Sequence, residues 1–135
     1  MSYPVIKIEG IGPKYAKMLQ DAGVSTTARL LDRAKNPKGR KELAAESGID
    51  ETYILKWANM ADLMRIKGVG EEYSELLEVA GVDTVKELRN RRPDNLHAKM
   101  AEVNATRKLV RALPSPNKVE DWVALAKSLP PVMTY

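Results

Sequence analysis

The amino-acid sequence predicts an all-α protein of two pseudo-repeated lobes that form one compact unit. Its 135 residues are 44% hydrophobic and 30% charged, which is enough apolar material for a packed core. Apolar residues recur at helical spacing, and no run convincingly alternates apolar and polar residues as a strand would. A segment of 23 residues occurs twice along the chain, and this indicates a duplicated unit.

The two copies of the repeat are residues 8–30 and residues 66–88, which align without gaps at an offset of 58. Ten of the 23 aligned pairs are identical. The glycine pairs near the start of the copies are Gly10 with Gly68 and Gly12 with Gly70. Each copy therefore predicts a tight turn, a helix, a second turn and a second helix.

The residues of the first copy justify these elements in order. Glycines permit the backbone angles of a tight turn, and Pro13 fits the first position of a helix over 13–22. Ala16, Leu19 and Ala22 give that helix an apolar stripe for burial. The signals that end this helix and cap the next are Gly23 and Thr26 in the first copy, and Gly81 and Thr84 in the second. The capped helices are expected at about 26–34 and 84–91.

Polar, Pro-containing segments follow both copies and are expected to be exposed loops. Further helices are expected at about 41–47, 51–64, 95–103, 105–113 and 118–129, with caps at Asp50, Asn104 and Asn117.

A second correspondence links two Trp-containing helices. The matching residues are Ile54, Trp57, Met60, Ala61 and Met64 with Val119, Trp122, Leu125, Ala126 and Leu129. A helix precedes the second glycine turn, whereas only a short extended segment precedes the first. We therefore expect the C-terminal helix to fold back and complete the N-terminal lobe. The lobes would then be residues 1–50, completed by 117–130, and residues 51–116.

The composition argues against catalysis. The chain has no cysteine and a single histidine, His97, which removes thiolate chemistry and multi-histidine metal sites. No pair of the 18 acidic residues stands in a pattern typical of catalysis. We expect no enzymatic activity, no cofactor and no metal. Since no apolar run is long enough to span a bilayer, we also expect a cytoplasmic protein without membrane contact.

The glycine turns carry a resemblance. The pattern apolar-x-Gly-apolar-Gly, followed by an amphipathic helix that ends in Ala-Gly-Val, resembles the helix-hairpin-helix motif of DNA repair and recombination proteins. Nearly the whole chain is similar to a bacterial helix-hairpin-helix family of unassigned function, which has two hairpins and a terminal Trp-containing helix. The segments that carry this resemblance are IEGIGPKYAKMLQDAGV, LMRIKGVGEEYSELLEVAGVDTVKEL, NLHAKM and VEDWVALAKSL.

The resemblance implies DNA backbone binding at the first hairpin. Backbone amides at a helix start carry partial positive charge, and glycines let the backbone approach an anion. The residues that would supply amides are Gly10, Ile11 and Gly12, and those that would supply charge are Lys14 and Lys17. Binding of this kind depends on salt and not on base sequence.

The second hairpin departs from the pattern, because Glu71, Glu72 and Glu75 replace Pro13, Lys14 and Lys17. Lys67 offsets this negative charge only in part. Lys67, Gly68 and Gly70 are therefore weaker candidates for contact with nucleic acid.

The net charge of +4 resolves into +6 over residues 1–41, −7 over 42–87 and +5 over 88–135. If the two ends of the chain meet, their basic loops form one surface. Its residues would be Lys35, Lys38, Arg40 and Lys41 with Arg107, Lys108 and Arg111.

Two alternatives to nucleic-acid binding stay open. The oppositely charged lobes suit a protein-protein interaction or self-association module. A regulatory helix-turn-helix protein is the third interpretation, based on the spacing of Ala44, Gly48, Ile54 and Trp57. Trp57 and Trp122 are expected in the core, with Tyr15 and Tyr73 bracing the hairpins against their helices.

Overall fold

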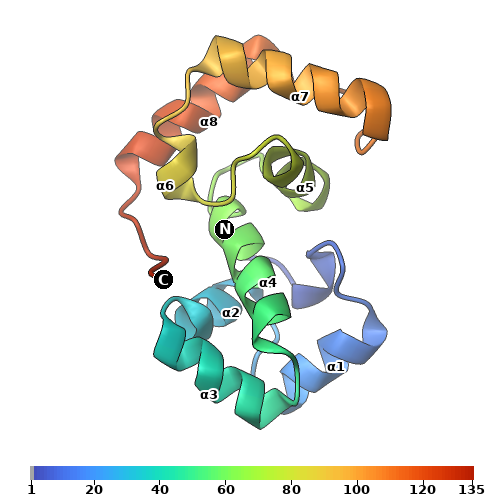
Figure 1. Cartoon of the computed structure of the whole chain (residues 1–135), viewed down its shortest axis with the longest axis vertical. Coiled ribbons are helices and arrows are strands. Elements are labelled where there is room, and N and C mark those ends of the chain that lie inside the picture. The colour runs from blue at the N-terminus through green and yellow to red at the C-terminus, as the bar shows by residue number, and fades with distance from the viewer. Residues whose placement is uncertain (1) are drawn as a thin grey trace.

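The computed structural model describes residues 2–135, and these residues fold into an all-helical molecule (Figure 1). Within them the backbone forms an isolated antiparallel bridge between Pro4 and Thr26 but no strand. The 3₁₀ helix is η1 (Val5–Lys7), and the α-helices are α1 (Pro13–Asp21), α2 (Thr27–Ala34), α3 (Pro37–Ser47), α4 (Glu51–Leu63), α5 (Glu71–Val79), α6 (Val85–Leu88), α7 (Pro93–Arg107) and α8 (Pro116–Ser128). We call η1 with α1–α4 the first half and α5–α8 the second half.

The sequence repeat is visible as a structural repeat. Helices α1 and α5 have nine residues each, and α4 and α8 have 13 each. Gly10 and Gly68 share the same positive φ of 94°, a conformation that glycine adopts most readily. The hydroxyls of Thr26 and Thr84 both accept a bond from the amide three residues later, as the sequence predicted. Each half therefore contains four α-helices.

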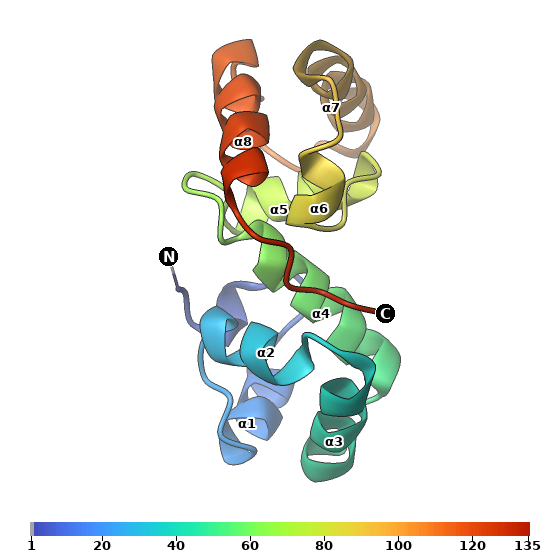
Figure 2. The same ribbon diagram turned by 90° about the vertical axis from the view of Figure 1, so that its left-hand side faces the viewer.

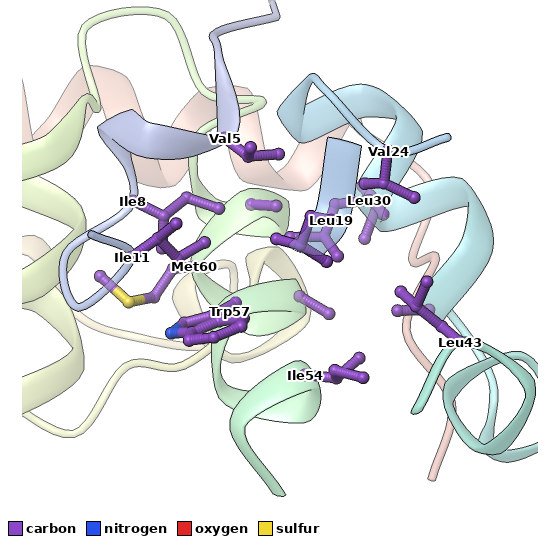
Figure 3. Close-up of a cluster of buried hydrophobic side chains, with 14 of the residues drawn as sticks. Val5, Ile8, Ile11, Leu19, Val24, Leu30, Leu43, Ile54, Trp57 and Met60 are labelled. Atoms are coloured by element: carbon purple, nitrogen blue, oxygen red, sulfur yellow. The ribbon is translucent and has the colours of Figure 1, made fainter. Parts of the chain in front are cut away.

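Each half has its own cluster of buried apolar side chains. In the first half, Leu19, Leu30 and Trp57 converge from α1, α2 and α4 (Figure 3). In the second half, Leu77 and Trp122 lie in the corresponding cluster. The tryptophans are thus core residues, as expected from their positions in the helices.

The position of α8 corrects one expectation. Its buried residues Val119, Trp122 and Val123 belong to the cluster of the second half, and α8 packs on α6 and α7. The expectation that residues 117–130 complete the first lobe is therefore wrong. Each Trp-containing helix instead packs in the half that contains the glycine turn preceding it in the chain, so the halves follow one another in tandem.

The change from one cluster to the other occurs at the end of α4 rather than after residue 50. Met64 belongs to the first cluster, whereas Leu63 and Ile66 belong to the second. The physical reason is the short connection from α3 to α4. Gly48, which has a φ of 77°, ends α3 and lets α4 fold back directly onto α2 and α3.

Residues 130–135 form a tail that returns from α8 to the first half and crosses α4 (Figure 2). Met133 is buried in the first cluster, and the amide of Thr134 donates to the carbonyl oxygen of Lys35 at 2.8 Å. The C-terminal end of the chain is therefore connected to the first half by the tail and not by α8.

Candidate nucleic-acid interface

The first glycine turn, residues 8–12, places its two glycines in different surroundings. Gly10 is exposed, but a Cβ built on it would lie 3.5 Å from Nε1 of Trp57, so that side of the glycine lies against the indole. A Cβ on Gly12 would meet no atom within 4 Å. Gly12 has an extended backbone with a φ of −87° and is the N-cap residue of α1. The Cβ side of Gly12, where the helix begins, is therefore open.

Backbone amides at the start of α1 are available to an external anion. The amide of Ala16 donates to the carbonyl oxygen of Gly12 at 2.9 Å, which is the first bond of the helix. The amides of Gly12, Lys14 and Tyr15 have no protein acceptor among the bonds of residues 2–135. Because these amides point outward from a helix N-terminus, they form an electropositive site.

Ile11 does not contribute as the sequence suggested. Its amide donates to the carbonyl oxygen of Ile8 at 3.1 Å, and this bond closes the turn. Its side chain is 4% exposed and belongs to the first cluster. Ile11 therefore holds the turn in shape and offers no free amide.

Two lysines follow the turn on the exposed surface of α1. Lys17 lies 3.6 Å from the carboxylate of Asp21 across one helical turn, with 76% of its side chain exposed. Such a solvent-exposed pair is weak and leaves the ammonium group accessible. Lys14 is also exposed and lies in the first turn of α1, beside the open amides.

The second glycine turn, residues 66–70, repeats the geometry with the opposite charge. The amide of Val69 donates to the carbonyl oxygen of Ile66 at 3.0 Å, and Gly70 caps α5. Glu71 and Glu72 occupy the first turn of α5, where carboxylates interact favourably with the helix dipole. These side chains place negative charge at the positive end of the helix, whereas Lys67 of the same glycine turn is exposed.

Glu75 connects the charges of the two halves. Its pKa is raised, first by burial and then by the nearby carboxylates of Glu9 and Glu78, while Arg107 and Lys56 oppose the shift. Glu9 lies in the first glycine turn, so the Glu75 carboxylate is near enough to that turn to be affected by its charge. The sequence contains no sign of this approach, because it depends on how the halves pack.

The basic loops do not merge into the expected surface. The start of α3 with Lys35, Lys38 and Lys41 lies in the first half, whereas α7 ends on the opposite side of the second half, near Arg107, Lys108 and Arg111 (Figure 1). The expected convergence required the folded-back C-terminal helix, which the structure lacks.

Arg40 is also removed from the candidate surface. It is 4% exposed, and its guanidinium donates to the carbonyl oxygen of Ala34 at 3.0 Å. The same group lies over the ring of Tyr135, 5.6 Å from its centre. Arg40 therefore supports the junction of α2, α3 and the tail.

Three aromatic side chains meet beside the first glycine turn. The rings of Tyr15 and Trp57 are 5.1 Å apart in an edge-to-face arrangement, so Tyr15 packs α1 against α4. The equivalent rings of Tyr73 and Trp122 are 5.3 Å apart. Tyr53 adds a third ring in the first half only.

Neither a metal centre nor a membrane helix stands out in the described part of the chain. Residues 2–135 contain no group of three or more His, Cys, Asp or Glu side chains arranged to hold a metal ion. None of their helices combines the length and the apolar character needed to cross a membrane.

No curated protein and no solved structure matches the chain. A family model described as "Domain of unknown function (DUF4332)" matches residues 9–129, which include both glycine turns and both Trp-containing helices. With nearly its whole length covered by that match, the chain belongs to the DUF4332 family.

Proposed function

We propose that the protein binds the backbone of nucleic acids, without reading base sequence, through the first glycine turn and the start of α1. The observation that carries this proposal is the open N-terminus of α1 at Gly12, with free amides and two exposed lysines beside it. A phosphate group satisfies both features, because it accepts several hydrogen bonds and is negatively charged. The resemblance of the turns to helix-hairpin-helix motifs supports the same ligand.

The proposal assigns one site to each chain. The second glycine turn has the same backbone geometry, but its helix start carries Glu71 and Glu72. Lys35, Lys38 and Lys41 lie around the start of α3, on the other side of the first half from the start of α1 (Figure 1). These lysines add long-range attraction and no direct contact with a phosphate held at Gly12.

The test is a titration of DNA at two salt concentrations with matched charge reversals. We expect Lys14→Glu with Lys17→Glu to weaken binding by about tenfold or more. The slope of log affinity against log salt concentration should fall by the equivalent of about two phosphate contacts. The control is Lys38→Glu with Lys41→Glu, which makes the same change in net charge away from the turn and should have a much smaller effect. Equal losses in the two double variants would reject the site, and no DNA binding by the wild-type chain would reject the function.

Self-association is the second candidate, and one observation favours it. Lys14 and Lys17 occupy the same positions of α1 that Glu72 and Glu75 occupy in the matching helix α5. The basic helix of one copy could pair with the acidic helix of another, and salt would weaken this contact. Light scattering over a range of protein concentrations measures it directly.

A charge exchange distinguishes the two candidates. If copies associate through these helices, a mixture of the Lys14→Glu/Lys17→Glu variant with a Glu72→Lys/Glu75→Lys variant should associate again. If the site binds nucleic acid, the first variant stays impaired in DNA binding in that mixture. A constant mass at all protein concentrations and low salt would reject self-association.

A further inference from the structure

Tyr53 is a large aromatic side chain whose position the core does not explain. It is 49% exposed on the first turn of α4. Its ring stacks on Trp57 with an interplanar angle of 22° and a centre-to-centre distance of 6.0 Å. The other exposed tyrosine, Tyr135, has evident partners, because its hydroxyl bonds Asn59 at 2.8 Å and its ring lies beside Arg40.

Trp57 connects the ring of Tyr53 to the first glycine turn. The indole Nε1 faces Gly10 of the first glycine turn, and the Tyr15 ring packs against the same indole. The rings of Tyr15 and Tyr53 are 6.0 Å apart. Because Tyr15 also offers one of the free amides of α1, this residue links the exposed ring of Tyr53 to the start of α1.

The second half shows that this third ring is dispensable for packing. Helices α4 and α8 align so that Trp57 matches Trp122, and Tyr15 and Tyr73 make the equivalent pairs with them. At the position of Tyr53, however, α8 has Lys118, which is exposed. The Tyr–Trp pair therefore forms without a third ring, and only the half with the basic turn has an outward aromatic surface.

The charges around Tyr53 permit a nucleic acid to approach. Lys56 is exposed one turn further along α4. Of the acidic neighbours, Asp50 is engaged as a helix cap, since its carboxylate accepts bonds from the amide and hydroxyl of Thr52, and Glu51 is half-buried. Lys14 provides further positive charge just before Tyr15.

We propose that Tyr53 is a stacking platform for an unpaired base, so that the protein prefers single-stranded over double-stranded nucleic acid. This inference rests on the proposed function, which supplies the phosphate contact at Gly12 and Lys14. Bases of a single strand have free faces that stack on aromatic rings, whereas a duplex covers those faces with neighbouring base pairs. Stacking tolerates any base, in agreement with binding that does not read sequence.

The test compares a labelled single strand of about 20 nucleotides with a duplex of the same length by fluorescence anisotropy. We expect the wild-type chain to bind the single strand more tightly. Tyr53→Ala should weaken binding of the single strand by about tenfold and leave the duplex unchanged. Tyr53→Phe keeps the ring and should retain the wild-type preference. Because Tyr53 is half exposed, thermal melting should show that both variants remain folded.

The outcomes separate this inference from the proposed function. If Lys14→Glu with Lys17→Glu weakens binding of both DNAs while Tyr53→Ala changes neither, the phosphate site stands and the stacking platform is rejected. Equal loss of single-strand and duplex binding in Tyr53→Ala also rejects the platform. Absence of binding to both DNAs by the wild-type chain rejects the function and the inference together.

Discussion

Gly39 shows how a single missing Cβ allows α3 to begin against α2. A Cβ at this position would lie 2.1 Å from the carbonyl oxygen of Arg33, which is backbone and cannot move aside easily. The amide of Gly39 also donates to the side chain of Asn36 at 2.7 Å, and this bond fixes the start of the helix. We expect Gly39→Ala to lower the free energy of unfolding by about 1–3 kcal/mol, measured by urea denaturation. A variant with wild-type stability would mean that α2 and α3 separate easily.

Gly12 makes the opposite prediction, because space around it is open and its φ is negative. Gly12→Ala should change the free energy of unfolding by less than about 0.5 kcal/mol. The added methyl group, however, stands where a phosphate would approach the amides. We expect DNA affinity to fall while stability is retained, and a titration of the folded variant measures this. Unchanged affinity would show that phosphate does not approach at Gly12.

Asp62 gives the stability of the protein a definite pH dependence. Its buried carboxylate accepts a bond from the amide of Val85 at 2.8 Å and lies 3.0 Å from Nε of Arg65. Burial raises the pKa of Asp62, and the Val85 bond and the Arg65 charge offset this only in part. Between the ordinary and the raised pKa, the folded state binds more protons than the unfolded state. The contribution of Asp62 to stability is therefore full below the ordinary pKa and is lost as pH rises through the raised pKa.

Asp62→Asn removes this titration and leaves an oxygen that can accept from Val85. We expect the free energy of unfolding of the wild-type chain, relative to this variant, to increase as pH falls from about 7 to about 4. Urea denaturation of both proteins across that range measures the difference. A difference that shrinks as pH falls would mean that the ion pair with Arg65, rather than burial, controls the pKa.

The helices show which features can be predicted from sequence. Local signals placed α1 and α4 within about a residue, because Pro13 and the Asp50 cap act on their own neighbours. Two helices expected at 95–103 and 105–113 are instead the single helix α7. Asn104 does not start a new helix there, since its side chain binds both the amide and the carbonyl oxygen of Val110.

The half in which α8 packs could not be predicted from such local signals, because the helix could pack with either glycine turn. The spacing around Trp57 and Trp122 is equal, and this fits a helix that serves either the turn before it or the turn after it. The short α3–α4 turn decides between these two arrangements, because it lets α4 fold back onto the half that precedes it. The first glycine turn could likewise be predicted as a candidate site from its local sequence. The positions of Tyr53 near Tyr15 and of Glu75 near Glu9 could not, because they depend on how the helices pack.

The two halves are held together by α4 and by the tail. Helix α4 passes from one half to the other, and the tail runs back across it (Figure 2). Where they cross, the guanidinium of Arg65 donates to the carbonyl oxygen of Pro130 at 2.9 Å. Asp62 of α4 binds the first amide of α6, so α4 contributes to the packing of both halves.

Removing residues 130–135 tests what the tail does for the whole molecule. The deletion removes the buried side chain of Met133 from the first cluster and the hydrogen bond between Thr134 and Lys35. Helix α8 keeps its contacts in the second cluster. We expect a loss of about 2–4 kcal/mol in the free energy of unfolding of the first half. Hydrogen exchange should therefore accelerate in α2, α3 and α4 and change little in α5 and α7. The matched control is Tyr135→Phe, which loses only the hydroxyl bond to Asn59 and should leave exchange in α2 close to wild type. Faster exchange confined to the second half would mean that the tail acts through α8 instead of through the first half.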